Sequence, residues 1–211
     1  GLVGLLFSAF LPRRWDVSAM ESGEGGRLFR FSLKGLVPLF LALVWLDSAA
    51  FYAIQETEDM RDMTWGTPAH LWGNGVVHLL FAVASGWALD KGRLRRVLAG
   101  ALIFLVSGCL WLKFGYGSIS WFGAALYVAG VSLYSTGLVA VVAQRGNAPD
   151  LLNMAPAAAL LLGVAGWIGS GMGIGMARDL GTVPFGFLLI ATVVAVVALR
   201  GLGPPRGRLA A

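Results

Sequence analysis

Charged residues are scarce in this chain of 211 residues, because Asp, Glu, Lys and Arg together make up 13% of the sequence and 57% of the residues are hydrophobic. So few polar side chains cannot cover the surface of a water-soluble globule of this length. The composition therefore predicts an integral membrane protein. The net charge of +5 does not indicate a nucleic-acid partner, since the cations are explained by sorting between the two sides of a membrane.

Cysteine and histidine are also rare. The single cysteine, Cys109, lies within an apolar run, so the chain cannot build a disulfide framework or a thiolate metal site. His70 and His78 stand eight residues apart without a third ligand nearby, and no Ser-His-Asp set shares a face. We therefore predict no metal, no cofactor and no enzymatic centre.

Long apolar runs are abundant. Each is long enough to cross a lipid bilayer as a helix, and closed barrels are not built from runs of this length. The sequence thus predicts an all-α integral membrane protein with the lipid bilayer as its surroundings. The six predicted spans are residues 35–54, 70–89, 97–112, 119–143, 151–176 and 183–199.

The two ends of the chain differ from this six-helix membrane domain, which we place at residues 35–200. Residues 1–11 are apolar but would span only about 16 Å as a helix, roughly half of the hydrocarbon thickness. A signal peptide would have an initiator Met and a basic segment ahead of the apolar run, and neither is present here. We therefore interpret these residues as the end of a truncated transmembrane helix. Residues 12–34 are charged and glycine-rich, which predicts a cytoplasmic linker, and residues 201–211 form a cytoplasmic tail.

The distribution of Lys and Arg predicts the orientation. If the chain enters its first span from the cytoplasm, all but three of its 16 cations lie on the cytoplasmic side. The outer hairpin, residues 55–69, is acidic instead. We therefore expect a multi-pass protein of the cell (inner) membrane, with both ends of the six-helix domain in the cytoplasm. The three outer cations are Arg61, Lys113 and Arg178.

A short basic turn joins the second and third predicted spans, with the pattern Gly-x-x-x-Asp-Lys followed by Gly and more cations. The pattern resembles the signature loop of the major facilitator superfamily, a family of secondary transporters, in which it joins the second and third helices of each six-helix half. Gly92 comes one position early and Leu94 interrupts the basic run. The residues that carry the resemblance are Gly86, Asp90, Lys91, Arg93, Arg95 and Arg96.

The resemblance implies that this chain is the C-terminal half of such a transporter. It would move a small-molecule solute by rocking-type alternating access, with proton coupling as an option, and its partner would be the missing N-terminal six-helix half. The alternative is a non-transporting structural subunit, in which the same helices hold together a larger membrane complex with another membrane subunit.

Polar residues are unevenly distributed among the spans. Spans 97–112 and 183–199 contain almost none, so these two can face lipid all round. The other four carry the polar and small residues. In the family, the first, second, fourth and fifth helices of a half line the cavity or the contact between halves, so this distribution agrees with the resemblance.

Asp47 and His78 are the candidate functional residues. Asp47 lies twelve residues beyond Gly35, hence about 18 Å along its helix, near mid-membrane, where a lone carboxylate costs at least ~2.5 kcal/mol. His78 precedes Asp90 by the same interval and so shares that depth. We predict a substrate or proton site with Asp47 as carrier and His78 as partner, although Asp47 could instead face an outer vestibule or pair with Tyr or Trp for packing. The further candidates are Tyr52, Asn74 and Tyr134.

The fifth span is rich in glycine. Glycine at intervals of two to four residues in an apolar helix lets a second helix approach closely and lets its own helix bend. We predict that role, with a backbone-lined substrate contact as the alternative. The glycines are Gly163, Gly166, Gly169, Gly171, Gly173 and Gly175.

Overall fold

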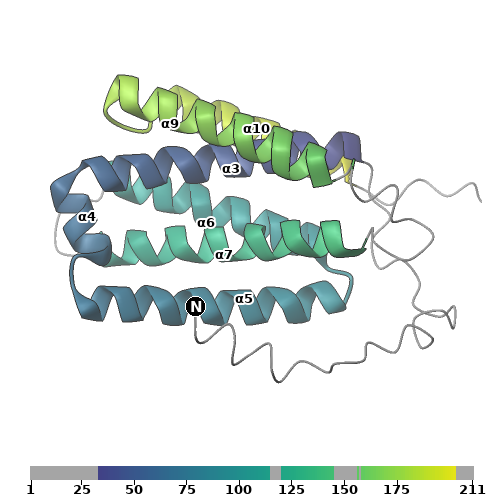
Figure 1. Ribbon diagram of the computed structural model, residues 1–211, viewed down its shortest axis with the longest axis horizontal. Helices are drawn as coiled ribbons and strands as arrows, with labels where there is room; N and C mark the ends of the chain where they lie inside the picture. Colours follow the sequence, from purple (N-terminus) through teal and green to yellow (C-terminus); the bar gives the residue numbers. More distant parts are fainter. Residues whose placement is uncertain (1–32, 115–119, 145–155, 157, 203–211) are drawn as a thin grey trace, which may run out of the picture.

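The computed structural model describes residues 33–114, 120–144, 156 and 158–202. Every element in these residues is a helix (Figure 1), which confirms the all-helical part of the predicted fold class. The predicted truncated helix 1–11 and most of the linker 12–34 and of the tail 201–211 lie outside the described residues.

Six apolar helical segments match the six predicted spans. Five of them are long and apolar enough to cross a membrane, and the sixth, α10, has 17 residues, or about 25 Å of helix. The fifth segment is continuous but begins as a π-helix, η2. The elements are α3 (Leu33–Glu56), α4 (Glu58–Trp65), α5 (Pro68–Asp90), α6 (Leu94–Phe114), α7 (Ser120–Gln144), η2 (Ala159–Ile168), α9 (Gly169–Leu180) and α10 (Phe185–Gly201).

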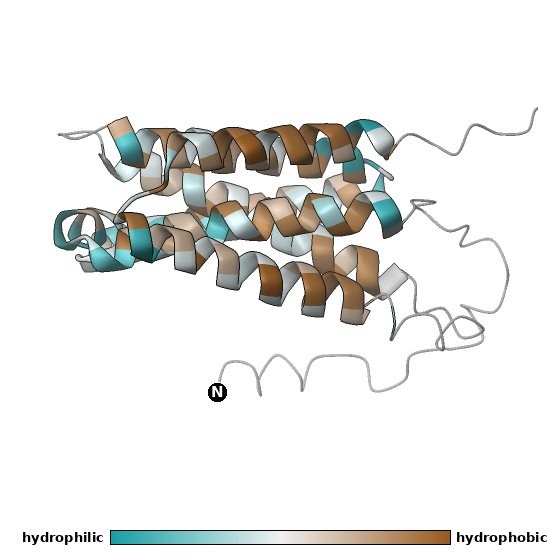
Figure 2. Cartoon of the chain, turned by 90° about the horizontal axis from the view of Figure 1, so that it is seen from above, coloured by the Kyte–Doolittle hydropathy of each residue, from teal (hydrophilic) through white to brown (hydrophobic). Residues whose placement is uncertain are grey.

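Local sequence explains where the helices begin and end. The side chain of Thr67 accepts a hydrogen bond from the backbone N–H of His70, and Pro68 follows as the first helical residue, so α5 has a capped start. Gly92 and Gly181, with φ of 70° and 64°, follow the ends of α5 and α9, because glycine adopts this left-handed conformation without steric cost. Along the bundle, hydrophobic residues fill the lengths of the helices and hydrophilic residues gather toward their ends (Figure 2).

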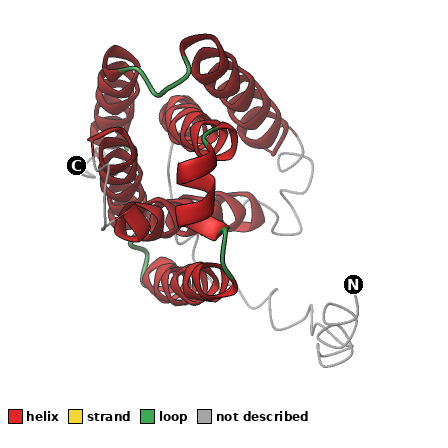
Figure 3. Cartoon of the chain, turned by 90° about the vertical axis from the view of Figure 1, so that its left-hand side faces the viewer, coloured by secondary structure: helices red, strands yellow, loops and turns green. Residues whose placement is uncertain are grey.

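The helices pack around a central pair, α3 and α7, which contact each other. Helix α5 packs on α7, and η2 and α9 pack on α3. Helix α6 packs on α7, α10 packs on α3, and α6 meets α10. The bundle seen toward its α4 end is shown in Figure 3. Exchanging the first three long helices for the last three relates the pair α5–α7 to α9–α3 and the pair α6–α7 to α10–α3, whereas the contact of α6 with α3 has no such counterpart between α10 and α7.

The composition of the third and sixth spans would allow them to face lipid all round, but in the structure neither helix does so. Helix α6 buries one side, including Leu98, Leu105 and Cys109, and α10 buries Ala191 and Ala195. Each of these helices is apolar all round. One side packs against the bundle, and the opposite side faces outward. The second span is the most exposed instead, since only Asn74, Ser85 and Leu89 of α5 are buried.

Two glycines of α9 bring it into close contact with α3. A Cβ atom added at Gly169 would lie 2.9 Å from the carbonyl oxygen of Leu41, and one at Gly173 would lie 2.6 Å from that of Trp45. Both distances are too short for a real side chain, so the two helices can approach this closely only with glycine at these positions.

The other four glycines of this segment do not pack within the described chain. A Cβ atom added at Gly163, Gly166, Gly171 or Gly175 would meet nothing within 4 Å. The packing role predicted for all six glycines is therefore supported at Gly169 and Gly173 alone.

This difference yields a matched test of the helix contact. Gly173→Ala should lower the free energy of unfolding by about 1–3 kcal/mol, because the added methyl group must displace the backbone of α3. Gly171→Ala, two residues away on the open side, should change it by less than about 0.5 kcal/mol. Unfolding of the purified protein in detergent measures both, and equal losses would contradict the packing described for α9.

The predicted orientation can be tested with cysteines in a Cys109→Ala background, because Cys109 is the only native cysteine and is buried. Asp59 in the outer hairpin and Lys91 in the basic turn are both exposed. Asp59→Cys should react with an impermeant thiol reagent added to intact cells, and Lys91→Cys should react only after the membrane is opened. The reverse pattern would overturn the predicted orientation, from which the depths of Asp47 and His78 were counted.

Candidate functional site

The carboxylate of Asp47 lies near the middle of α3 and is bound by two tyrosines of α7. The hydroxyl of Tyr127 donates to Oδ1 and that of Tyr134 donates to Oδ2, each at 2.5 Å. Tyr127 and Tyr134 are only 5% and 8% exposed. Each carboxylate oxygen therefore has a donor of its own, which offsets part of the cost of placing this group among apolar helices.

The spacing of the two tyrosines explains this geometry. They lie seven residues apart, two helical turns, so both project from the same side of α7 toward α3. Tyr134 was a predicted site residue and Tyr127 was missed. The seven-residue spacing was the signal that could have found Tyr127, together with the need of a mid-span carboxylate for a second donor.

His78 lies near the middle of α5 and also reaches α7. Its Nδ1 atom is 2.5 Å from the hydroxyl oxygen of Ser132, which is completely buried, whereas the His78 side chain is exposed. Ser132 falls between Tyr127 and Tyr134 along α7. Asp47 and His78 therefore contact α7 within the same two turns, as expected from their predicted common depth.

The structure does not bring Asp47 and His78 into contact. Helix α7 stands between their two helices, with the tyrosines on the side of α3 and Ser132 on the side of α5. A direct Asp47–His78 pair is thus absent from the described arrangement. Each of the two groups instead bonds to a side chain of α7.

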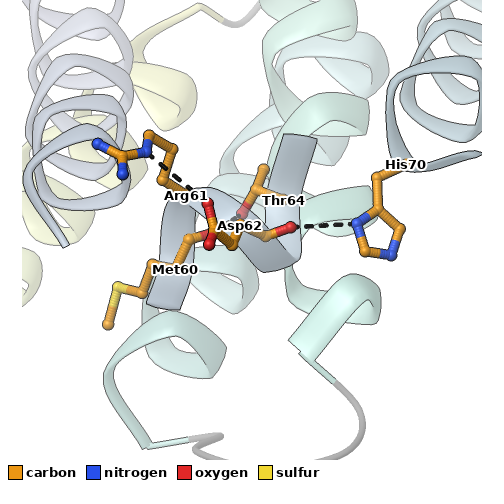
Figure 4. Close-up of polar contacts among 5 residues, drawn as sticks. All are labelled: Met60, Arg61, Asp62, Thr64 and His70. Carbon is orange, nitrogen blue, oxygen red and sulfur yellow. Dashed lines mark hydrogen bonds and ion pairs between the residues drawn. The ribbon is translucent and has the colours of Figure 1, made fainter. Parts of the chain in front are cut away.

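Asn74 belongs to a different place, the junction between α4 and α5. Its Nδ2 atom donates to the carbonyl oxygen of Thr64 at 2.6 Å, and its Oδ1 atom is buried without a partner among the described residues. His70 of α5 reaches the same junction, with its Nδ1 3.3 Å from the carbonyl oxygen of Asp62 in α4 (Figure 4). Within α4, the Thr64 hydroxyl donates to the carbonyl oxygen of Met60. Asn74 therefore anchors the short helix α4, which lies at one end of the bundle (Figure 1).

Tyr52, the remaining candidate, lies on α3 closer to α4 than Asp47 does. Its side chain is half-buried and packs against the hydrophobic core. The described structure shows no hydrogen bond from its hydroxyl. Tyr52 is thus near the bound carboxylate in sequence without belonging to its hydrogen-bonded group.

The basic turn is a tight connection between α5 and α6. The backbone N–H of Gly92 donates to the carbonyl oxygen of Leu89 at 2.8 Å, and the ammonium group of Lys91 lies 3.6 Å from the centre of the Trp87 ring. The charged residues of the turn are exposed, and within the described residues Asp90 forms no ion pair. These exposed residues are Asp90, Lys91, Arg93, Arg95 and Arg96, and a Cβ atom added at Gly86 would meet no neighbour.

Comparison of the chain with known protein families, with curated proteins and with solved structures found no match. The class of the protein therefore follows from its own features. Helices of this length and hydropathy are those of a multi-pass membrane protein. Within the described helices, the bound carboxylate of Asp47 and the exposed imidazole of His78 are its most distinctive polar groups.

Proposed function

We propose that this chain is one six-helix half of a secondary active transporter similar to the major facilitator superfamily. The half would rock against a second half to move a small solute, with Asp47 as the proton carrier. The observation that carries this proposal is the mid-helix carboxylate of Asp47, bound across the α3–α7 contact by Tyr127 and Tyr134. Ionisable groups within membrane spans are costly and mark ion or substrate pathways.

The correspondence of the pairs α5–α7 and α6–α7 with α9–α3 and α10–α3 supports this proposal. Transporter halves of this kind are built from two inverted three-helix repeats, with the binding site where the repeats meet. Here α3, the first helix of one set of three, contacts α7, the first helix of the other. Asp47 and its two tyrosines form the polar part of that contact.

The exposed sides of the bundle support a second half as partner. Along the middle of α10 the exposed side chains are aliphatic, as a lipid-facing surface requires: Leu189, Ile190, Val193 and Val197. Helix α5 also exposes aliphatic side chains such as Val76 and Leu79, but among them it exposes His78, and the η2–α9 segment exposes Gly163 and Gly171. An imidazole directed at lipid in mid-span is unfavourable, so the exposed side of α5 suits contact with another helical bundle or with a water-filled path.

The carrier assignment is tested by transport measured on the full-length protein in proteoliposomes with an imposed pH gradient. Asp47→Asn should abolish gradient-driven uptake of a solute found by screening, because an amide keeps the size of the carboxylate but cannot carry a proton. His78→Gln should slow uptake without abolishing it. Asp59→Asn, which removes an exposed carboxylate of the outer hairpin, is the matched control and should transport at the wild-type rate.

Normal uptake by Asp47→Asn would exclude Asp47 as the carrier. If no solute is transported by the wild-type protein, and Asp47→Leu still assembles into a larger membrane complex, the protein is a structural subunit. In that case the carboxylate is dispensable, and the helices serve as a scaffold.

A further inference from the structure

The hydroxyl of Ser132 takes part in two short contacts that fix the position of its one hydrogen atom. Its Oγ atom lies 2.6 Å from the carbonyl oxygen of Val128, one turn earlier on α7, and 2.5 Å from Nδ1 of His78. A carbonyl oxygen can only accept. Two oxygens at 2.6 Å repel each other unless a proton lies between them, so the Ser132 hydrogen is directed at Val128.

The Ser132 oxygen can then only accept from the imidazole. We infer that Ser132 holds His78 with its proton on Nδ1, which leaves Nε2 as a hydrogen-bond acceptor. No hydrogen bond to Nε2 occurs within the described residues, and the side chain is exposed. Ser132 is thus a positioning residue, because the bond made by one imidazole nitrogen sets the state of the other.

Nε2 of His78 is an acceptor on an exposed side chain, and it has no partner among the described residues. Both oxygens of Asp47 are bonded to tyrosines. The hydroxyls of Ser135 and Thr136 donate to carbonyl oxygens of their own helix. Because His78 is exposed whereas Tyr127 and Tyr134, which bind Asp47, are buried, Nε2 of His78 is an acceptor that a solute at this depth can reach. It fits a hydrogen-bond donor such as a hydroxyl, an amide or an ammonium group. This last step rests on the proposed transport function, whereas the position of the proton does not.

Nitrogen NMR of the purified full-length protein tests the inference directly, because the two tautomers of an imidazole have opposite patterns of protonated and unprotonated nitrogen signals. The described chain has two histidines, His70 and His78, and the His78→Gln variant assigns their signals. With ¹⁵N-labelled histidine at alkaline pH, the His78 signals of the wild-type protein should show a protonated Nδ1 and an unprotonated Nε2.

Three variants separate positioning from a general structural effect. Ser132→Ala should abolish the preference for Nδ1, and Ser132→Thr should restore it, since threonine supplies an equivalent hydroxyl. Ser135→Ala is the matched control one turn away and should leave the His78 signals unchanged, because Ser135 does not contact the imidazole. A proton on Nε2 in the wild-type protein, or an unchanged tautomer in folded Ser132→Ala, would overturn the inference.

Uptake kinetics test the solute contact. Ser132→Ala should raise KM roughly tenfold, the equivalent of about one hydrogen bond, with kcat nearly unchanged, and Ser132→Thr should restore KM. An unchanged KM together with a lost Nδ1 preference would refute the solute contact alone. A protein without any transport would refute the proposed function, and the NMR result would still decide the position of the proton.

Discussion

A single carboxylate constrains the middle of this bundle. The two oxygens of Asp47 on α3 accept hydrogen bonds from Tyr127 and Tyr134 on α7, and without those donors a charged group among apolar side chains would cost several kcal/mol. The bonds join the two helices on which the others pack, since α6 and α5 lie on α7 while α10, η2 and α9 lie on α3. The bonds of Asp47 thus add a polar link between these two helices, which α6 also joins by packing on both.

Apolar burial and close backbone approach complete the arrangement. Leu39, Phe40 and Leu43 are fully buried on α3, and Gly169 and Gly173 let α9 lie directly against the backbone of that helix. Hydrophobic burial is a weak guide between membrane helices, because lipid is as apolar as leucine. Glycine contacts and hydrogen bonds consequently decide which helices meet.

Hydropathy predicted the six helices closely, because run length and the absence of charge depend only on local sequence. It also indicated Asp47 and His78, since ionisable residues in apolar runs stand out. It could not show that α7 separates them, that Asn74 anchors α4, or that α5 is more exposed than α6. Those facts depend on which side of each helix meets a neighbour, and helices that are apolar on every side, such as α6 and α10, carry no periodic signal for it.

The bond between Asp47 and its tyrosines is tested most directly by a double-mutant cycle on the free energy of unfolding. In the wild-type background, Tyr134→Phe should cost about 1.5–3 kcal/mol, the range for a hydrogen bond to a charged group. In an Asp47→Leu background the same change should cost almost nothing. As the control, Tyr52→Phe should change the free energy of unfolding by the same amount in both backgrounds. Equal losses from Tyr134→Phe in the two backgrounds would contradict the account, because the hydroxyl of Tyr134 would then act independently of Asp47.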